Sequence, residues 1–144
     1  MKPLNSFAVR SHLIGVSKGV IWTIALFYFY GAIVHVFNIF SLSGFDWCAA
    51  PFKWKVLDVV YLVIDLVVAV GLIRGWKLGY LAFYLAAISQ IILYTAFRDW
   101  IVDVPAEFLV SEEQLGYLTT LVVFHCVTIA LLTLAVWIRK RSLQ

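Results

Sequence analysis

The chain has 144 residues, of which 64% are hydrophobic and 13% are charged, and its formal net charge is +3. A soluble globular domain carries about 25% charged residues, so this composition excludes a soluble enzyme and favours one small integral membrane domain. No second domain, repeat or low-complexity tract is found over residues 1–144, and nothing indicates nucleic-acid binding.

Four apolar segments are long enough to cross a bilayer as helices: about 18–41, 56–73, 78–97 and 114–138. About 20 helical residues span the hydrocarbon core, so we predict an all-α, four-helix transmembrane bundle. The first segment is longer than the apolar region of a signal peptide and no A-x-A site follows it, so we expect it to be retained. The second and third segments are joined by a very short turn, which predicts an antiparallel hairpin.

Charges are distributed unevenly between the two sides of the predicted bundle. Basic residues without acidic neighbours lie before the first segment, between the second and third, and after the fourth: Lys2, Arg10, Lys18, Arg74, Lys77, Arg139, Lys140 and Arg141. Most acidic residues lie in the other two connections: Asp46, Asp99, Asp103, Glu107, Glu112 and Glu113. The positive-inside rule therefore predicts that both termini and the middle turn are cytoplasmic.

Polar residues recur within the apolar segments at a spacing of three or four, which places them on one face of each helix. These faces carry, in chain order, Tyr28, Gly31, His35 and Asn38; Asp58, Tyr61, Asp65 and Ala69; Ala87, Gln90, Tyr94 and Arg98; and His125 with Thr128. Polar faces with small residues point into a membrane bundle rather than at lipid. We therefore predict that the four faces converge.

Asp65 lies near the middle of the second segment, where an unpaired carboxylate costs several kcal/mol. His35, Gln90 and His125 lie at similar or more outward depths, so we predict a polar pocket that opens toward the outside. The candidate catalytic residues are Asp65, His35 and His125, and the candidate ligand-binding residues are Asn38, Asp58, Tyr61, Gln90 and Tyr94. The alternative is that each side chain only holds helices together, because single interhelical hydrogen bonds contribute about 1 kcal/mol.

The connections carry further signals. The first outer loop, 41–55, is rich in aromatic residues beside lysines: Phe45, Trp47, Phe52 and Trp54. We interpret it as an interfacial anchor, with a lid over the pocket as the alternative. In the second outer loop, Pro105 ends any continuing helix, and Ser111 with Gln114 predicts a capping box for the fourth segment.

The two cysteines, Cys48 and Cys126, lie at different depths, which argues against an intramolecular disulfide. We interpret each as a small apolar side chain. Two histidines and one aspartate can also ligate a metal, but these three come from separate helices with no spacing signature, and no metal site is predicted.

The chain resembles the DoxX-like family of small bacterial membrane proteins. The resemblance is carried by Gly31 and His35 in GAIVHVF, by Pro51 among the aromatics of the first loop, and by Asp65 six residues before a Gly-Leu pair in VVYLVIDLVVAVGLI. In the family this acid is more often Glu, and the proline-rich segment is longer. The resemblance implies a multi-pass protein of the bacterial inner membrane, in a family linked to quinone-dependent sulfur oxidation or redox-stress complexes.

The leading hypothesis is a quinone-linked redox or accessory subunit in which Asp65 with His35 or His125 exchanges protons or hydrogen-bonds a quinone. An imidazole beside a carboxylate suits this role, because the ordinary pKa of the imidazole is about 6.5. The alternatives are a small-molecule or proton-coupled transporter acting as an oligomer, and a structural subunit of a larger membrane complex. The expected partners are the lipid bilayer and either other membrane subunits or further copies of this chain.

Overall fold

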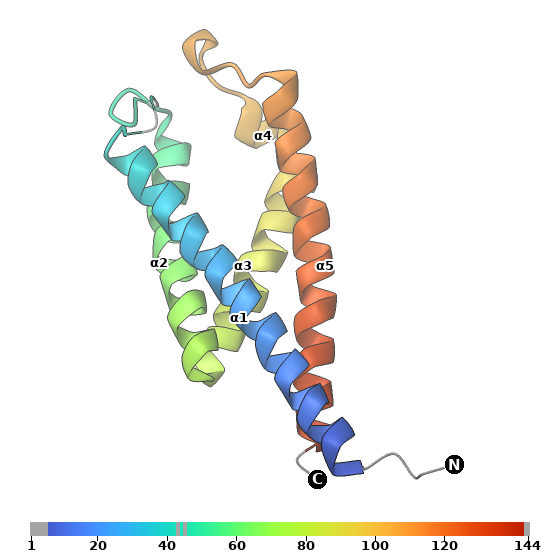
Figure 1. The fold of residues 1–144 in the computed structure, drawn as a ribbon. Coiled ribbons are helices and arrows are strands. Elements are labelled where there is room, and N and C mark those ends of the chain that lie inside the picture. Colours follow the sequence, from blue (N-terminus) through green and yellow to red (C-terminus); the bar gives the residue numbers. More distant parts are fainter. Residues whose placement is uncertain (1–5, 43, 45, 143–144) are drawn as a thin grey trace.

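The computed structural model describes residues 6–42, 44 and 46–142; Lys2 and Phe45 lie outside them. The elements are α1 (Ser6–Ile39), α2 (Phe52–Arg74), α3 (Lys77–Thr95), α4 (Arg98–Val102), a 3-10 turn η1 (Ala106–Phe108) and α5 (Glu112–Ser142) (Figure 1). Within the described ranges, four helices are long and apolar enough to cross a membrane: α1 from Arg10, α2, α3 and α5. The predicted all-α bundle of four spanning helices is confirmed.

The four long helices form a ring in which α1 packs on α2 and α5, and α3 packs on α2 and α5. The start of α1, the α2–α3 turn and the end of α5 lie at one end of the molecule, which we call the basic end. The connections at residues 40–51 and 96–111 lie at the other, which we call the loop end. The start of α1 and the end of α5 lie at the same end of the molecule, as the four predicted spans require.

Two boundaries differ from the predicted segments. Helix α1 begins at Ser6 instead of near Lys18, because no proline or turn separates the basic lead from the apolar segment. The second outer loop contains two short elements that the sequence does not predict, α4 and η1. Pro105 follows α4 by three residues and directly precedes η1. It separates the two short elements, because proline has no backbone N–H and cannot continue a helix.

The predicted hairpin and capping box both form. Gly75 ends α2 at φ +69°, and the Trp76 N–H donates to Gly71 O at 2.8 Å, a six-to-one bond that turns the chain into α3. At α5, the Gln114 N–H donates to Ser111 Oγ at 3.2 Å, and the Ser111 N–H donates to Gln114 Oε1 at 2.8 Å.

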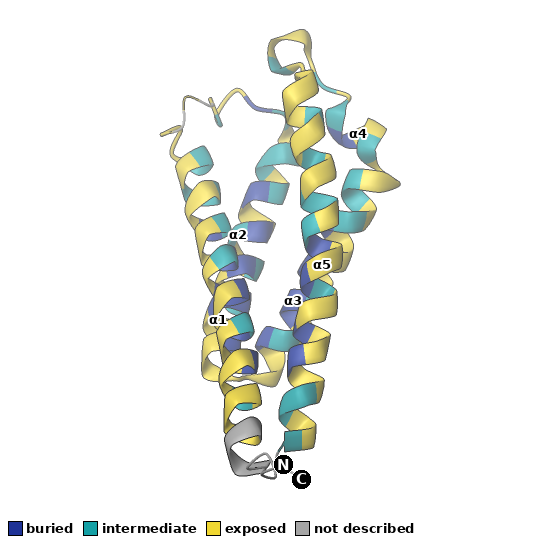
Figure 2. Cartoon of the chain, turned by 45° about the vertical axis from the view of Figure 1, so that its right-hand side comes forward, coloured by how far each residue is buried: buried dark blue, intermediate teal, exposed yellow. Residues whose placement is uncertain are grey.

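The core lies in the half near the basic end. Buried apolar residues from all four long helices pack there, with Ala25, Val68, Phe83, Ala86 and Leu132 essentially without exposed surface. Figure 2 shows that the buried positions face the interior of the bundle. Large apolar side chains are exposed on its outside. Those outer side chains identify the surface that contacts the lipid bilayer.

Candidate functional site

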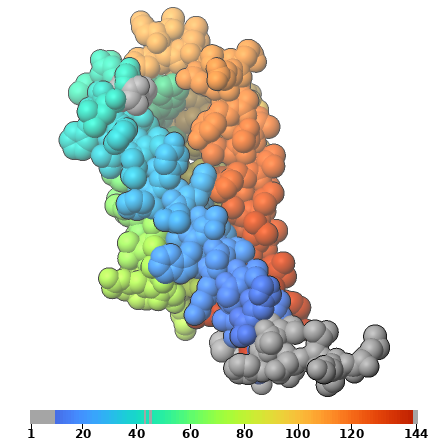
Figure 3. Space-filling model, viewed as in Figure 1, coloured from blue at the N-terminus to red at the C-terminus, as the bar shows by residue number. Residues whose placement is uncertain are grey.

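A cavity of about 470 Å³ occupies the half of the bundle near the loop end. It is lined by all eight sequence-predicted residues: His35 and Asn38 from α1, Asp58, Tyr61 and Asp65 from α2, Gln90 and Tyr94 from α3, and His125 from α5. The space-filling view shows a hollow between α1 and α5 at this level, with α2 behind it (Figure 3). The predicted convergence of the four polar faces is therefore realised in the structure.

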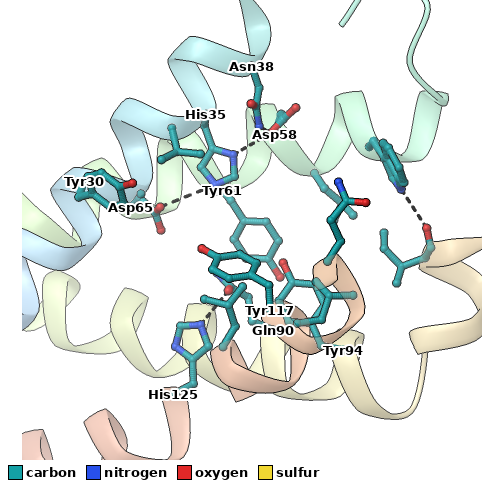
Figure 4. A pocket seen from close by; sticks show the side chains of 18 of the residues that line it. Tyr30, His35, Asn38, Asp58, Tyr61, Asp65, Gln90, Tyr94, Tyr117 and His125 are labelled. Carbon is teal, nitrogen blue, oxygen red and sulfur yellow. Dashed lines mark hydrogen bonds and ion pairs between the residues drawn. The ribbon is translucent and has the colours of Figure 1, made fainter. Parts of the chain in front are cut away.

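His35 stands between two carboxylates of α2. Its Nδ1 lies 2.8 Å from Asp58 Oδ1, and its Nε2 lies 3.8 Å from Asp65 Oδ2 (Figure 4). Asp58 and Asp65 are seven residues apart, which is two helical turns, so both reach the same imidazole from one face. Asn38 adds a second donor to Asp58 Oδ1, at 3.2 Å.

Asp58 is more enclosed than its place near the start of α2 indicates. The sequence places it at the outer boundary, where ionisation is cheap, but its residue is only 7% exposed and it is the closer acid to His35. His35 and Asn38 of α1 both contact its Oδ1, so α1 covers it on that side.

The two sides of His35 are held differently. Its Nδ1 lies within hydrogen-bond distance of Asp58 Oδ1, whereas the 3.8 Å between its Nε2 and Asp65 Oδ2 is too long for a direct hydrogen bond. An imidazole with a carboxylate on each side is the kind of group that exchanges protons in acid–base chemistry.

Asp65 is placed by a glycine of the neighbouring helix. A Cβ built on Gly31 would lie 2.5 Å from Asp65 Oδ2, so the carboxylate occupies the space left by the absent side chain. Asp65 Oδ1 is buried and has no hydrogen-bond partner among the described residues. A buried acceptor without a partner leaves one hydrogen bond for a ligand or water.

His125 belongs to a different cluster. Its Nε2 lies 2.7 Å from Gln90 Oε1, so the imidazole N–H donates to the amide oxygen across α5 and α3. The two residues are 1% and 8% exposed, and His125 is further fixed because Thr128 donates to its backbone carbonyl at 3.1 Å. Asp65 thus lies beside His35, whereas His125 pairs with an amide instead of an acid.

Aromatic side chains line the space between the two clusters. Figure 4 shows Tyr61 and Tyr117 between the His35 side and the His125 side of the pocket. Tyr61 stacks beside His35 with ring centroids 6.2 Å apart, and its hydroxyl lies 3.0 Å from Ser89 Oγ. Tyr94 contributes a further ring to the wall. The cavity therefore combines flat apolar surfaces with polar groups at two opposite sides.

The loop end of the pocket is covered by residues 98–110, which we call the roof segment. Ile101, Val102 and Val110 of this segment line the cavity. The first turn of α2 holds the segment, because Lys53 Nζ donates to the carbonyls of Trp100 and Asp103, and Trp54 Nε1 donates to Ile101 O at 2.9 Å.

Arg98 ties the other side of the roof segment to α5. Its guanidinium donates to Leu115 O at 2.9 Å and to Thr119 Oγ1 at 3.3 Å. Arg98 thus leaves the pocket face on which the sequence places it beside Gln90 and Tyr94. The sequence indicates a lid only in the first outer loop and gives no signal for the roof segment, because α4 is a five-residue helix without an apolar period.

Several site residues escape the sequence analysis. Tyr30 lines the pocket, and Ser89 anchors the Tyr61 hydroxyl. Their only signal is adjacency to a predicted residue, Gly31 or Gln90, and neighbours on a helix point about 100° apart.

Cys48 and Cys126 are both unpaired, as expected, but exposed rather than packed as apolar fillers. Among the described residues, no three His, Cys, Asp or Glu side chains form a group that can hold a metal ion.

Comparison of the chain with models of protein families, with curated proteins and with solved structures finds no match.

Proposed function

We propose that this multi-pass protein binds a quinone headgroup in the pocket and acts as a redox subunit or accessory protein of a quinone-linked oxidoreductase. One observation carries the proposal: two polar pairs, His35 with Asp65 and His125 with Gln90, lie on opposite walls of a cavity lined by aromatic rings. A quinone has oxygen atoms at the two ends of a flat apolar ring, and this arrangement is complementary to it.

The residues present fit such a ring in size and in polarity. The cavity volume of 470 Å³ falls within the range of about 300–1,000 Å³ for small-molecule sites. Tyr61 and Tyr117 offer faces against which a planar ring can stack. The partnerless Asp65 Oδ1 offers an acceptor for the hydroxyl of the reduced form, the quinol, in the buried part of the site.

Quinone chemistry, when the group is bound, is the exchange of two electrons together with two protons. The chain's own part is to hold and move the protons. His35 Nε2 lies 3.8 Å from Asp65 Oδ2, so a ligand oxygen can bond to both groups and exchange protons with them, and Asp58 fixes the other side of the imidazole at 2.8 Å. The His125–Gln90 pair supplies a hydrogen-bonding wall without an acid.

The proposed setting is the bacterial inner membrane, with the basic end in the cytoplasm. The basic residues at the start of α1, in the α2–α3 turn and at the end of α5 support this orientation. The resemblance to the DoxX-like family supports the redox assignment, because the residues that carry it, Gly31, His35 and Asp65, form one contact cluster.

The test is direct binding of a decyl-tailed benzoquinone to the purified chain in lipid nanodiscs, followed by quenching of tryptophan fluorescence, since Trp54 lines the pocket. We expect saturable binding that Asp65→Asn weakens about tenfold, or about 1.4 kcal/mol. Asp103→Asn, an exposed acid outside the cavity lining, is the matched control and leaves the affinity unchanged. Absence of binding, or equal affinities for both variants and the parent, contradicts the proposal.

A further inference from the structure

The exposed part of the pocket lining is confined to two helices. Among the described residues that line the cavity, the exposed ones are Tyr30 and Val34 of α1 and Gln114 and Tyr117 of α5; the linings from α2, α3 and α4 are buried or half-buried. We call these four residues the portal. Tyr30 and Tyr117 are 60% and 59% exposed, so the cavity meets the surface between α1 and α5.

The other boundaries of the cavity are closed. Toward the basic end, α1 and α5 come together where the rings of Phe27 and Phe124 lie 3.8 Å apart. At the loop end, the roof segment is bonded to α2 through Lys53 and Trp54, and the rings of Trp54 and Phe108 lie 6.1 Å apart. Figure 3 shows the hollow between α1 and α5 with the roof segment passing above it.

The portal lies within two membrane-spanning helices and therefore opens sideways to the hydrocarbon of the bilayer. The surface beside it on α1 is apolar, because Leu26 and Phe37 are exposed on the same face of the helix as Tyr30 and Val34. A water-soluble ligand has no path through such a surface, because burying its polar groups in hydrocarbon costs several kcal/mol each.

We infer that the pocket is loaded from within the membrane through the portal, by an amphiphile whose polar ring enters the cavity while its hydrocarbon tail stays between α1 and α5. The identity of the ring rests on the proposed function, but the route does not. This lateral route differs from the outward opening predicted from the sequence. The substrate class is thus long-tailed lipids with a compact polar head, and short, tailless rings bind more weakly because the portal contributes nothing to them.

The test uses a long-chain alcohol carrying a diazirine, irradiated with the chain in nanodiscs, with labelled residues located by mass spectrometry. Tyr28 and Tyr61 are buried yet line the cavity, so label reaches them only through the pocket. We expect both to be labelled in the parent. Val34→Trp places a bulky ring in the portal and lowers their labelling about tenfold, in the range by which steric gating slows association.

Two controls locate the effect. Val63→Trp adds the same ring to an exposed position of α2 outside the cavity lining and leaves the labelling of Tyr28 and Tyr61 unchanged. Leu85, exposed on α3, reports bulk lipid and is labelled equally in every variant. Parent chain that lacks label at the two tyrosines, or unchanged labelling in Val34→Trp, overturns the inference.

A roof variant separates the two possible routes. Lys53→Met loosens the roof segment, and we expect labelling of Tyr28 and Tyr61 to remain as in the parent. If Lys53→Met instead raises their labelling and Val34→Trp has no effect on it, the ligand enters at the loop end and the inference is wrong.

Competition distinguishes the route from the proposed function. If excess unlabelled long-chain alcohol and excess decyl-tailed benzoquinone both suppress labelling of Tyr61, both conclusions are supported. If only the alcohol suppresses it, the lateral route is supported and the quinone assignment fails.

Discussion

The two halves of this bundle differ in what fills the space between the same four helices. Near the basic end, the space between helices is filled by small and apolar residues, and Gly71 approaches Gly79 so closely that a Cβ on either would lie about 2.4 Å from the other's backbone. Near the loop end, the helices enclose a cavity with acids, histidines and amides. Close packing in one half can therefore offset the free-energy cost of polar groups and empty space in the other.

The boundary between the halves is visible in the aromatic contacts. Phe27 stacks on Phe124 at the level where α1 and α5 meet, and Tyr28 contacts Phe83 with ring centroids 5.6 Å apart. On the loop side of Tyr28 and Phe83, the buried residues include the polar side chains of Asp58, Asp65 and Gln90. Changes near the basic end should therefore affect stability alone, whereas changes near the loop end should affect the ligand as well.

The largest expected effect comes from Gly71→Val. The new side chain meets the Gly79 backbone, which cannot move aside as a flexible side chain can, so α2 and α3 must separate. We expect a loss of about 3 kcal/mol in the free energy of unfolding, measured by circular dichroism during titration of detergent micelles with SDS. Gly116→Ala on α5, where a Cβ meets nothing within 4 Å, is the control. Equal stability of the two variants would show that the hairpin contact does not hold the bundle.

His35→Leu is expected to act next most strongly. It removes the shared partner of Asp58 and Asp65, and a buried hydrogen bond to a charged group contributes about 2 kcal/mol. The same SDS titration measures the loss. Adding Asp58→Asn should restore part of it, because the second change removes the unpaired acid. His12→Leu, at an exposed histidine, should cost nothing, and a comparable loss there would argue against the pairing.

Gly31→Ala should leave the fold intact while changing the site. The added methyl occupies the space of Asp65 Oδ2, and the carboxylate can move because it ends a side chain. We expect an affinity for the decyl-tailed benzoquinone about fivefold weaker, or about 1 kcal/mol, with little change in unfolding. Gly19→Ala on the same helix has open space around its Cβ and serves as the control. An effect of Gly31→Ala on stability alone would separate Asp65 from ligand binding.

The smallest effect concerns the roof segment. Lys53→Met removes the side-chain bonds to the carbonyls of Trp100 and Asp103, which are exposed and contribute about 0.5 kcal/mol. Hydrogen exchange of the amides in residues 98–110 should become faster, while the rest of the chain is unchanged. Lys55→Met removes a similar bond, to Cys48 O in the first loop, and should leave the roof segment protected.

Much of this architecture could be predicted from the sequence, because helix periodicity is a local signal. The spacing of Asp58, Tyr61 and Asp65 predicts one face of α2, and all three are buried. Ser111 and Gln114 predict the cap that forms. What periodicity does not give is the rotation and height of one helix against the next, so it leaves open which acid His35 meets first.

The site residues that were missed have the same explanation. The roles of Arg98 and Lys53 depend on backbone carbonyls of distant segments, and every residue has a carbonyl, so no side-chain pattern marks the acceptor. The closeness of Gly31 to Asp65 depends on which helices are neighbours. These contacts arise only once the ring of four helices is assembled.

One imidazole between two acids also fixes how α1 can slide along α2. A shift of α1 by one turn, about 5.4 Å, would carry His35 past one carboxylate and leave the other unpaired in the membrane. Two apolar helices in lipid otherwise have many alignments of similar energy. The cluster therefore favours a single register of α1 against α2.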